Sequence, residues 1–316
     1  MKKVLVDGHS GAVSLNIKML LNHREDLEVI CLDDKKMFTP EQRVNLLNTA
    51  DIVILCQSSK TAVDTLPLIE NPATKVIDTS NAFRLAPGWT YGLPELAPDQ
   101  RRRITMSKRV ALPAAAVTGS ALLVNPLMKA KIMPPYHPIY INSFMGYSGG
   151  GTNMINLYEN PHRPETYGGV RQYALDPNQN ILQQKELMQA VGASYRPCIS
   201  PVIMDYPNGA LVTVPMHLRT LAKRLHTKQI WETMAKYYED EKFVRVAPYS
   251  ENADNMGGFL DSTALAGTPF AEIFVFGDND ICLLAVRYDN LGKGGGTACV
   301  QCMNLMLGLE EYTGLI

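Results

Sequence analysis

The chain has 316 residues, which is enough for two domains of ordinary size. Hydrophobic residues make up 46% and charged residues 19%, with 30 basic residues against 31 acidic ones, so no basic excess points to nucleic acid. No apolar run reaches the roughly 18 residues that a membrane span needs, and the apolar stretch at residues 4–6 is too short for a signal peptide, so a cytoplasmic protein is expected.

The first third of the chain alternates short apolar runs with helical patterns. Strands are expected at residues 4–6, 27–32, 51–56 and 75–78, with helices at 13–22, 41–49 and 59–69 between them. Strands separated by helices of this length form right-handed βαβ units, and uninterrupted apolar strands are typical of a parallel sheet covered on both faces. Residues 1–112 are therefore predicted to form a Rossmann-type, doubly wound α/β domain.

The pattern changes after residue 137, where strands follow one another without regular helices between them. They are expected at residues 139–144, 200–204, 210–217, 243–246, 270–276 and 281–287. A Gly-Asp-Asn-Asp turn between the last two predicts a hairpin. We expect an α+β domain with a mixed sheet over residues 113–290, and a C-terminal segment, 291–316, whose helix at 297–309 returns to the first domain.

The first strand runs into a glycine-rich turn that is typical of dinucleotide-binding proteins. Asp7-Gly8 opens a Gly-x-x-Gly-x-x-Ser pattern that continues through Gly11 into the first helix. Glycines at such a turn let the backbone approach a pyrophosphate, whose charge meets the N–H groups of the helix N-terminus. A doubly wound domain without a nucleotide is the alternative.

The end of the second strand leaves the choice of dinucleotide open. Asp33 there favours a bond to the ribose 2′-hydroxyl of NAD, whereas Lys35 and Lys36 favour the 2′-phosphate of NADP. The predicted cofactor is therefore NAD or NADP, and Asp33 slightly favours NAD.

Further motifs point to one family. The sequence carries Asp-Gly-x-x-Gly at 7–11, Asp-Thr-Ser-Asn-Ala-Phe-Arg at 78–84, Pro-x-x-x-x-Thr-Gly at 113–119, Gly-Tyr-Ser-Gly-Gly-Gly at 146–151 and Asp-Asn-Leu-Gly-Lys-Gly-Gly at 289–295. Their order and spacing resemble the N-acetyl-gamma-glutamyl-phosphate reductase family, particularly its shorter bacterial form, over nearly the whole chain. The resemblance implies a semialdehyde-dehydrogenase-like fold and a homodimer or homotetramer.

The resemblance also implies a thioester mechanism, for which this chain lacks the main groups. A Cys thiolate in a run like Asn-Pro-Gly-Cys-Tyr-Pro-Thr-Gly displaces phosphate from an acyl phosphate, and Ala115 stands at its position here. The acid/base His of the family lies in a His-x-His-x-Pro-Glu-like segment, and the matching residues 176–186 contain no His. A methyl group cannot attack, so covalent acyl transfer at this position is excluded. The loss of both groups indicates natural divergence.

Other residues are candidates for the remaining chemistry. Cys56 and Cys198 are the alternative nucleophiles. Tyr147, Ser148 and His217 are the candidate proton donors, although a lone His in an apolar strand is more often structural. The Cys299-x-x-Cys302 pair has neither a second pair nor a nearby His, so no metal site is predicted and the two are interpreted as small buried residues on one helix face.

The remaining candidates are binding residues. Cofactor contacts are predicted for Gly8, Ser10, Gly11, Ala12, Val13, Asp33, Cys56, Ser80, Asn290 and Gly292. Substrate contacts are predicted for Arg84, Gly149 and Lys293, with a surface ion pair as the alternative for Arg84 and Lys293.

Two functions from different classes follow from these residues. In the first, the protein is an NAD(P)-dependent oxidoreductase that transfers hydride without a covalent intermediate to or from a small anionic carbonyl or imine metabolite. In the second, it is a non-catalytic nucleotide- or metabolite-binding pseudoenzyme of the same family.

Overall fold

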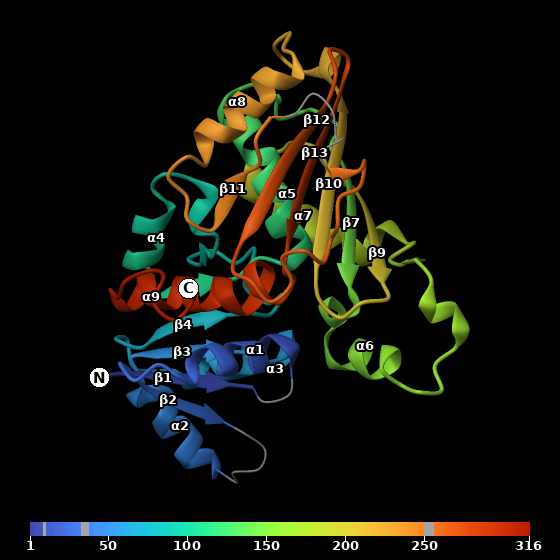
Figure 1. Cartoon of the computed structure of the whole chain (residues 1–316). Coiled ribbons are helices and arrows are strands. Elements are labelled where there is room, and N and C mark those ends of the chain that lie inside the picture. Colours follow the sequence, from blue (N-terminus) through green and yellow to red (C-terminus); the bar gives the residue numbers. More distant parts are fainter. Residues whose placement is uncertain (9–10, 33–37, 250–255) are drawn as a thin grey trace. The chain divides into compact units, whose positions relative to one another are not determined.

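The computed structural model describes residues 1–8, 11–32, 38–249 and 256–316. The chain forms two compact units (Figure 1). Unit 1 consists of Met1–Ala114 together with Gly295–Ile316, and unit 2 consists of Ala115–Gly294. Among the described residues, no helix combines the length and apolarity that crossing a bilayer requires.

Unit 1 is built on a six-stranded sheet in the order β2-β1-β3-β4-β6-β5, in which every pairing is parallel. Its strands are β1 (Lys2–Asp7), β2 (Leu27–Leu32), β3 (Ile52–Leu55), β4 (Lys75–Asp78), β5 (Thr90–Tyr91) and β6 (Arg109–Ala111). All four residues of β3 are buried, as expected for a central strand covered on both faces. The predicted parallel sheet is confirmed.

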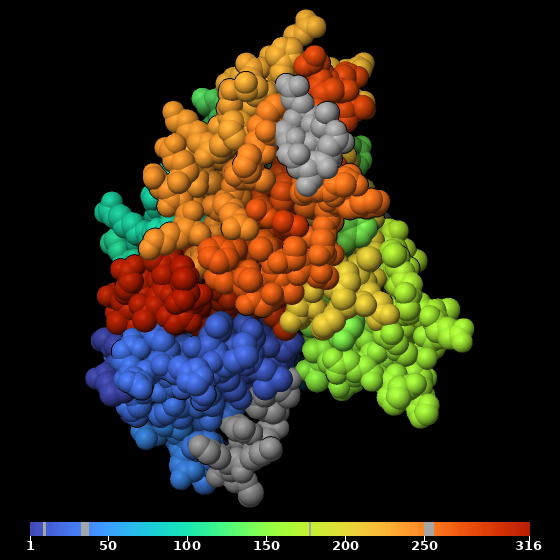
Figure 2. Space-filling view, in the orientation of Figure 1, coloured from blue at the N-terminus to red at the C-terminus, as the bar shows by residue number. Residues whose placement is uncertain are grey.

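Within its described residues, unit 1 contains the α-helices α1 (Ala12–Leu21), α2 (Pro40–Thr49), α3 (Ser59–Thr65), α4 (Gln100–Met106) and α9 (Thr297–Leu307). α9 contacts α1, α4 and β4, so the C-terminal segment completes the unit that the N-terminal segment begins. In Figure 2 this C-terminal segment, in red, lies against the N-terminal residues in blue. Cys299 and Cys302 are both buried on α9, as predicted.

Unit 2 is built on a seven-stranded mixed sheet in the order β11-β12-β13-β10-β7-β9-β8. Its strands are β7 (Tyr140–Gly146), β8 (Arg171–Gln172), β9 (Cys198–Met204), β10 (Ala210–His217), β11 (Val244–Val246), β12 (Ala271–Gly277) and β13 (Ile281–Tyr288). The β7–β9 and β11–β12 pairs are parallel and the others antiparallel. The predicted mixed sheet is confirmed, as is the hairpin, in which Gly277 pairs with Cys282.

The helices of unit 2 are α5 (Ala115–Lys129), α6 (Gly151–Tyr158), α7 (Ile181–Val191) and α8 (Thr227–Tyr237). α5 contacts β10, β13, α7 and α8, and residues 117–127 of it are buried. α5 is therefore the central helix of the unit, and it lies against the sheet in Figure 1. Short helical turns occur at Leu66–Leu68, Pro94–Leu96, Tyr147–Gly150, Glu165–Gly168, Pro177–Asn180, Leu218–Thr220 and Gly292–Gly296.

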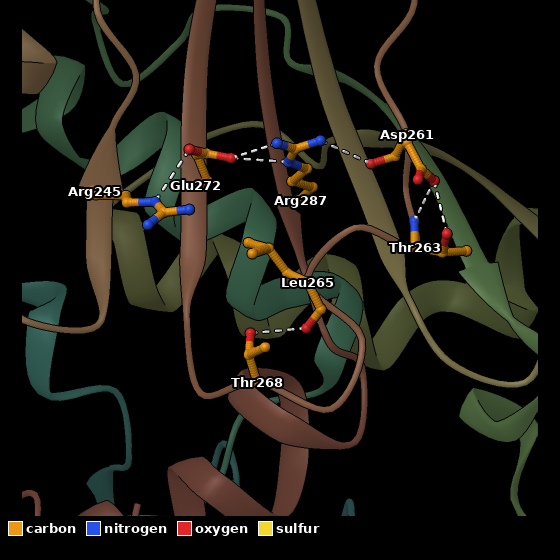
Figure 3. A network of polar contacts seen from close by, with 7 residues as sticks. All are labelled: Arg245, Asp261, Thr263, Leu265, Thr268, Glu272 and Arg287. Carbon is orange, nitrogen blue, oxygen red and sulfur yellow. Dashed lines mark hydrogen bonds and ion pairs between the residues drawn. The ribbon is translucent and has the colours of Figure 1, made fainter. Parts of the chain in front are cut away.

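Charged side chains cross-link three neighbouring strands of this sheet (Figure 3). Glu272 on β12 accepts hydrogen bonds from Arg245 on β11 at 3.1 Å and from Arg287 on β13 at 2.7 Å. Arg287 also donates to the backbone oxygen of Asp261 at 3.3 Å. One carboxylate thus holds the edge of the sheet together through charge-assisted hydrogen bonds.

Candidate functional site

Gly8, which opens the glycine-rich turn of unit 1, is held by close contacts with neighbouring backbone. Gly8 follows β1 with φ +135°, and a Cβ there would lie 2.2 Å from the carbonyl oxygen of Cys56. The Cys56 N–H donates to the Asp7 carbonyl at 2.8 Å, and the Ser14 hydroxyl donates to the Gly8 carbonyl. No residue with a side chain fits at Gly8, which is what a turn that brings backbone close to a pyrophosphate requires.

The start of α1 has the open geometry that a phosphate needs. Gly11 is the N-cap of α1, with ordinary extended backbone, and a Cβ built on it meets no atom within 4 Å. Ala12 is buried and Val13 is half-buried in the first turn of the helix. The predicted contacts of Ser10 and Asp33 lie outside the described residues. The geometry at Gly8 and Gly11 therefore fits a dinucleotide pyrophosphate at the helix N-terminus.

Two further predicted cofactor residues follow neighbouring strands of the same sheet. The Ser80 hydroxyl donates to Asp78 Oδ2 at 2.9 Å and accepts from the Ala82 N–H at 3.0 Å. Burial raises the pKa of the Cys56 thiol to about 12. A thiol that remains protonated at neutral pH is a poor nucleophile, which argues against Cys56 as a replacement for the missing cysteine, and its role as a nucleophile stays a prediction.

Arg84 holds the chain just before the 113–119 run. Its Nε donates to the Leu112 carbonyl at 2.8 Å, and its other nitrogens donate to the Thr79 carbonyl and the Asn81 side chain. The guanidinium is half-buried and ties the end of β4 to Leu112. Arg84 therefore has a structural role within unit 1, and its contact with a substrate stays a prediction.

Ala115 is the first residue of α5 and is half-buried, with other residues of unit 2 packed against it. The Tyr288 hydroxyl donates to the Ala115 carbonyl at 2.6 Å. A Cβ on Gly294 would lie 2.9 Å from the Ala115 methyl, and one on Gly119 would lie 2.7 Å from the Tyr288 ring. Burial raises the pKa of Tyr288 far above its usual range, so this hydroxyl remains a donor. Glycines and one tyrosine fix the position at which the cysteine is missing.

Sequence reasoning did not single out Tyr288 for this role. Tyr288 is fully buried at the end of β13, so in the sequence it resembles any other core residue of that strand. The only available signal was its place directly before the Asp-Asn-Leu-Gly-Lys motif.

Two predicted site residues from separate motifs meet in unit 2. Asn290 Nδ2 donates to the Ser148 hydroxyl at 2.8 Å, and that hydroxyl donates to Asn208 Oδ1 at 2.7 Å. Asn290 Oδ1 accepts from the Gly209 N–H at 2.8 Å. Gly149 lies beside this network, since a Cβ on it would be 3.6 Å from Asn290 Nδ2. The Ser148 proton is thus held by Asn208, a residue that sequence reasoning did not single out.

Tyr147 faces an aromatic cluster. Its ring stacks on Tyr158 with 4.9 Å between centroids, and its hydroxyl donates to Glu159 at 3.3 Å. Burial, followed by the charge of Glu159, raises the pKa of Tyr147. This environment makes Tyr147 a weaker acid than an ordinary tyrosine.

His217 is exposed at the last residue of β10, opposite Ile281. Ala210, at the other end of the strand, pairs with Met145, next to the network of Ser148 and Asn290. Seven residues of extended strand span about 24 Å. The structure therefore does not bring His217 together with the other candidate proton donors.

Lys293 and Gly292 lie inside unit 2. Lys293 is fully buried, with Nζ 5.6 Å from the centre of the Phe243 ring. A Cβ on Gly292 would lie 2.6 Å from the Thr268 carbonyl oxygen, so this glycine permits a close backbone approach. The complete burial of Lys293 rules out the surface ion pair that was its alternative. Across the described ranges, no cluster of three or more His, Cys, Asp or Glu side chains is arranged to hold a metal ion.

Sequence comparisons match the chain in two parts. Residues 3–104 match the semialdehyde dehydrogenase NAD binding domain, and residues 116–290 match the semialdehyde dehydrogenase dimerisation domain. The protein named N-acetyl-gamma-glutamyl-phosphate reductase 2 from Nostoc sp. is 37% identical, over 99% of this chain and 99% of its own. A protein of the same name from Pseudomonas putida is 34% identical over 98% of both chains.

Solved structures show the same fold at lower sequence identity. Aspartate semialdehyde dehydrogenase II from Vibrio cholerae, complexed with ASA, superposes with a TM-score of 0.75 at 16% identity, over 98% of both chains. Aspartate semialdehyde dehydrogenase from Francisella tularensis gives 0.74 at 15% identity, over 97% of this chain and all of its own.

Proposed function

This chain belongs to the semialdehyde dehydrogenase family, with N-acetyl-gamma-glutamyl-phosphate reductases among its relatives, and from that premise we propose that it is an NAD(P)-dependent oxidoreductase without a covalent intermediate. The proposed substrate is a small anionic carbonyl or imine metabolite. The proposed assembly is a homodimer or homotetramer, in keeping with the dimerisation domain.

One observation carries this proposal: the backbone geometry at Gly8 and Gly11 fits a dinucleotide, whereas position 115 carries only a methyl group. The residues that would hold the cofactor are Gly8, Gly11 and the first N–H groups of α1. When bound, the nicotinamide supplies or accepts a hydride. Hydride transfer to a carbonyl or imine needs a proton donor and correct positioning but no nucleophile.

A cationic side chain is the natural partner of an anionic metabolite. Arg84 and Lys293 are the proposed substrate-binding cations, although each also has a place in its own unit. Arg84 bonds the Leu112 carbonyl, and Lys293 lies over Phe243. Tyr147 and Ser148 are the proposed proton donors, since His217 lies at the far end of β10.

The second candidate function, a nucleotide-binding pseudoenzyme, is favoured by a different observation. The proton of Ser148 is held by Asn208, and that of Tyr147 by Glu159. Groups whose protons are already held in hydrogen bonds transfer them less readily to a substrate. In this candidate the dinucleotide binds and is not turned over.

Calorimetric titration with the oxidised and reduced forms of NAD and NADP is the first test. We expect at least one form to bind, and Gly11→Val to abolish that binding. Valine is compatible with the backbone at Gly11, and nothing lies within 4 Å of its Cβ, so the variant should fold while its side chain occupies the phosphate position.

A panel of small aldehydes, ketones and imines that carry a carboxylate or phosphate then separates the two candidates. The enzyme predicts a change in nicotinamide absorbance with at least one of them, and loss of that activity in Gly11→Val. Tight dinucleotide binding with no turnover on the panel contradicts the enzyme and supports the pseudoenzyme. Absence of dinucleotide binding contradicts both.

A further inference from the structure

We propose that Arg43 is a positioning residue of the cofactor site, which neutralises the Asp7 carboxylate beneath the Gly8 turn so that a pyrophosphate can bind there. This inference rests on the proposed dinucleotide site and adds to it a residue from α2, which none of the sequence motifs contains. It concerns charge rather than direct contact with the cofactor.

The ion pair lies at the carboxyl end of the unit 1 sheet. Asp7 is the last residue of β1 and directly precedes Gly8. Its side chain is only 6% exposed, and Arg43 Nη2 donates to its Oδ2 at 2.7 Å. A buried carboxylate is therefore built into the strand end from which the phosphate-binding turn starts.

Arg43 is held in place from a second side. The same Nη2 donates to the hydroxyl of Thr65, the last residue of α3, at 2.8 Å. Thr65 is 2% exposed, and its hydroxyl donates in turn to Gln57 Oε1 at 3.0 Å. The guanidinium thus joins α2, β1 and α3 in a fixed geometry, which a surface ion pair between two mobile side chains would not have.

The charge balance at this strand end gives the pair its importance. A dinucleotide pyrophosphate is an anion that would bind at the turn directly after Asp7. Like charges that lie close together repel strongly where water is partly excluded. Arg43 cancels the carboxylate charge before the ligand arrives. Without it, the backbone contacts of Gly8 would remain, but the strand end would lose its preference for an anion.

The test compares four forms of the full chain by calorimetry with NADH and NADPH: wild type, Arg43→Gln, Asp7→Asn and the double variant. We expect Arg43→Gln to lower the affinity for both dinucleotides about tenfold or more. Asp7→Asn should bind at least as well as wild type, and the double variant should match Asp7→Asn within about threefold.

The chain supplies a matched control on the same strand. Lys2, at the other end of β1, forms an ion pair with Asp51 at 3.1 Å. Lys2→Gln removes the same formal charge from unit 1 far from the turn, so the affinities should stay within about twofold of wild type.

Three results would overturn the inference. Arg43→Gln with unchanged affinity would show that the pair has no influence on the ligand. A double variant much weaker than Asp7→Asn would show that Arg43 contacts the cofactor itself. Loss of NADPH binding with NADH binding unchanged would show that Arg43 contacts the 2′-phosphate.

The comparison of the double variant with Asp7→Asn also holds if Arg43→Gln alone fails to fold, because neither of those two forms has an unpaired buried carboxylate. A wild type that binds neither dinucleotide would contradict the cofactor site itself. Binding that is lost in Gly11→Val and kept in Arg43→Gln would contradict only the role of Arg43.

Discussion

The glycine-rich turn of unit 1 and the N-terminus of α5 in unit 2 are built in similar ways and differ in what their function requires. Gly8 packs against the Cys56 backbone, and Gly294 packs against the Ala115 methyl. The phosphate binding proposed at the first position needs only backbone N–H groups, which any residue other than proline provides. Acyl transfer at the second needs one particular side chain, and position 115 does not provide it.

The difference shows that scaffold and chemistry are separable in unit 2. Tyr288 donates to the Ala115 carbonyl and not to its side chain, so this hydrogen bond does not depend on which side chain stands at position 115. The side chain at position 115 therefore decides whether a nucleophile is present, whereas the hydrogen bond from Tyr288 involves only the backbone. Five experiments test how far this contrast between the two units extends.

The largest expected effect concerns the missing chemistry of unit 2. Restoring Ala115→Cys alone should yield no thioester, because the segment 176–186 still lacks a proton-handling His. Phosphate-dependent oxidation of N-acetylglutamate semialdehyde should stay at least about 10⁴-fold below an intact enzyme, since members of a catalytic unit are strongly non-additive. NAD(P)H formation with and without phosphate measures this, and mass spectrometry detects an acyl adduct. Robust phosphate-dependent activity of the wild type would show that another nucleophile operates.

The next test asks whether unit 1 supplies the thiol that unit 2 lacks. With its pKa raised to about 12 by burial, Cys56 should react with iodoacetamide at least about 100-fold more slowly than the exposed Cys198 near pH 8. Peptide mapping over time gives both rates in one sample. Labelling of Cys56 as fast as Cys198 would reinstate it as a candidate nucleophile.

A glycine pair tests whether unit 1 depends on backbone shape alone. Gly8→Ala places a methyl group against a carbonyl at a positive φ, so the free energy of unfolding should fall by about 3 kcal/mol or more. Gly11→Ala meets open space at an ordinary φ and should change it by less than about 1 kcal/mol. Urea unfolding of both variants checks the difference. Equal stabilities would contradict the tight approach of Gly8 to Cys56.

Unit 2 should draw stability from its sheet, away from position 115. Glu272→Gln removes the charge that two arginines share, and its carboxylate is only 13% exposed. The free energy of unfolding should fall by about 1–2 kcal/mol. Arg219→Gln breaks a pair with Asp280 that lies in solvent, and thermal unfolding should not detect it. Equal effects of the two changes would show that the network in Figure 3 has no special role.

The smallest effect concerns a buried carboxylate of unit 1. Asp78 Oδ1 is buried and has no hydrogen-bond partner among the residues that the structure describes, and burial raises the pKa of this carboxyl. The folded state therefore favours the neutral form, so the stability contribution is complete below about pH 4 and is lost as the pH rises through the raised pKa. Asp78→Asn should stabilise the protein by on the order of 1 kcal/mol at pH 7 and not at pH 4.

Asp51, which directly precedes β3 of the same sheet, provides a pKa shift of the opposite sign. The Lys3 backbone N–H donates to its carboxylate at 2.8 Å, and this bond lowers the pKa of Asp51. Its contribution is present at neutral pH and is lost as the pH falls through the lowered pKa. Asp51→Asn should therefore destabilise the protein at pH 7 and less so at low pH. The same sign for both variants would contradict the assignment of Asp78.

The sequence by itself determined the elements whose signals are local. The apolar runs at 27–32 and 75–78 coincide with β2 and β4, and the turn before residue 281 marks the hairpin of β12 and β13. Continuous apolar strands and turn residues carry this information within a few positions. α5 escaped prediction because it is buried all round, so its sequence lacks the one-sided apolar period of a surface helix.

Only the tertiary structure decided which candidate residues meet. Ser148 and Asn290 lie 142 positions apart and share a hydrogen bond, whereas His217 is placed at the opposite end of β10. The bond from Tyr288 to the Ala115 carbonyl and the pairing of Arg43 with Asp7 likewise join distant segments. A sequence pattern reports what each segment forms, but the contacts between segments depend on how the sheets are ordered and on which residues the pairing register places side by side.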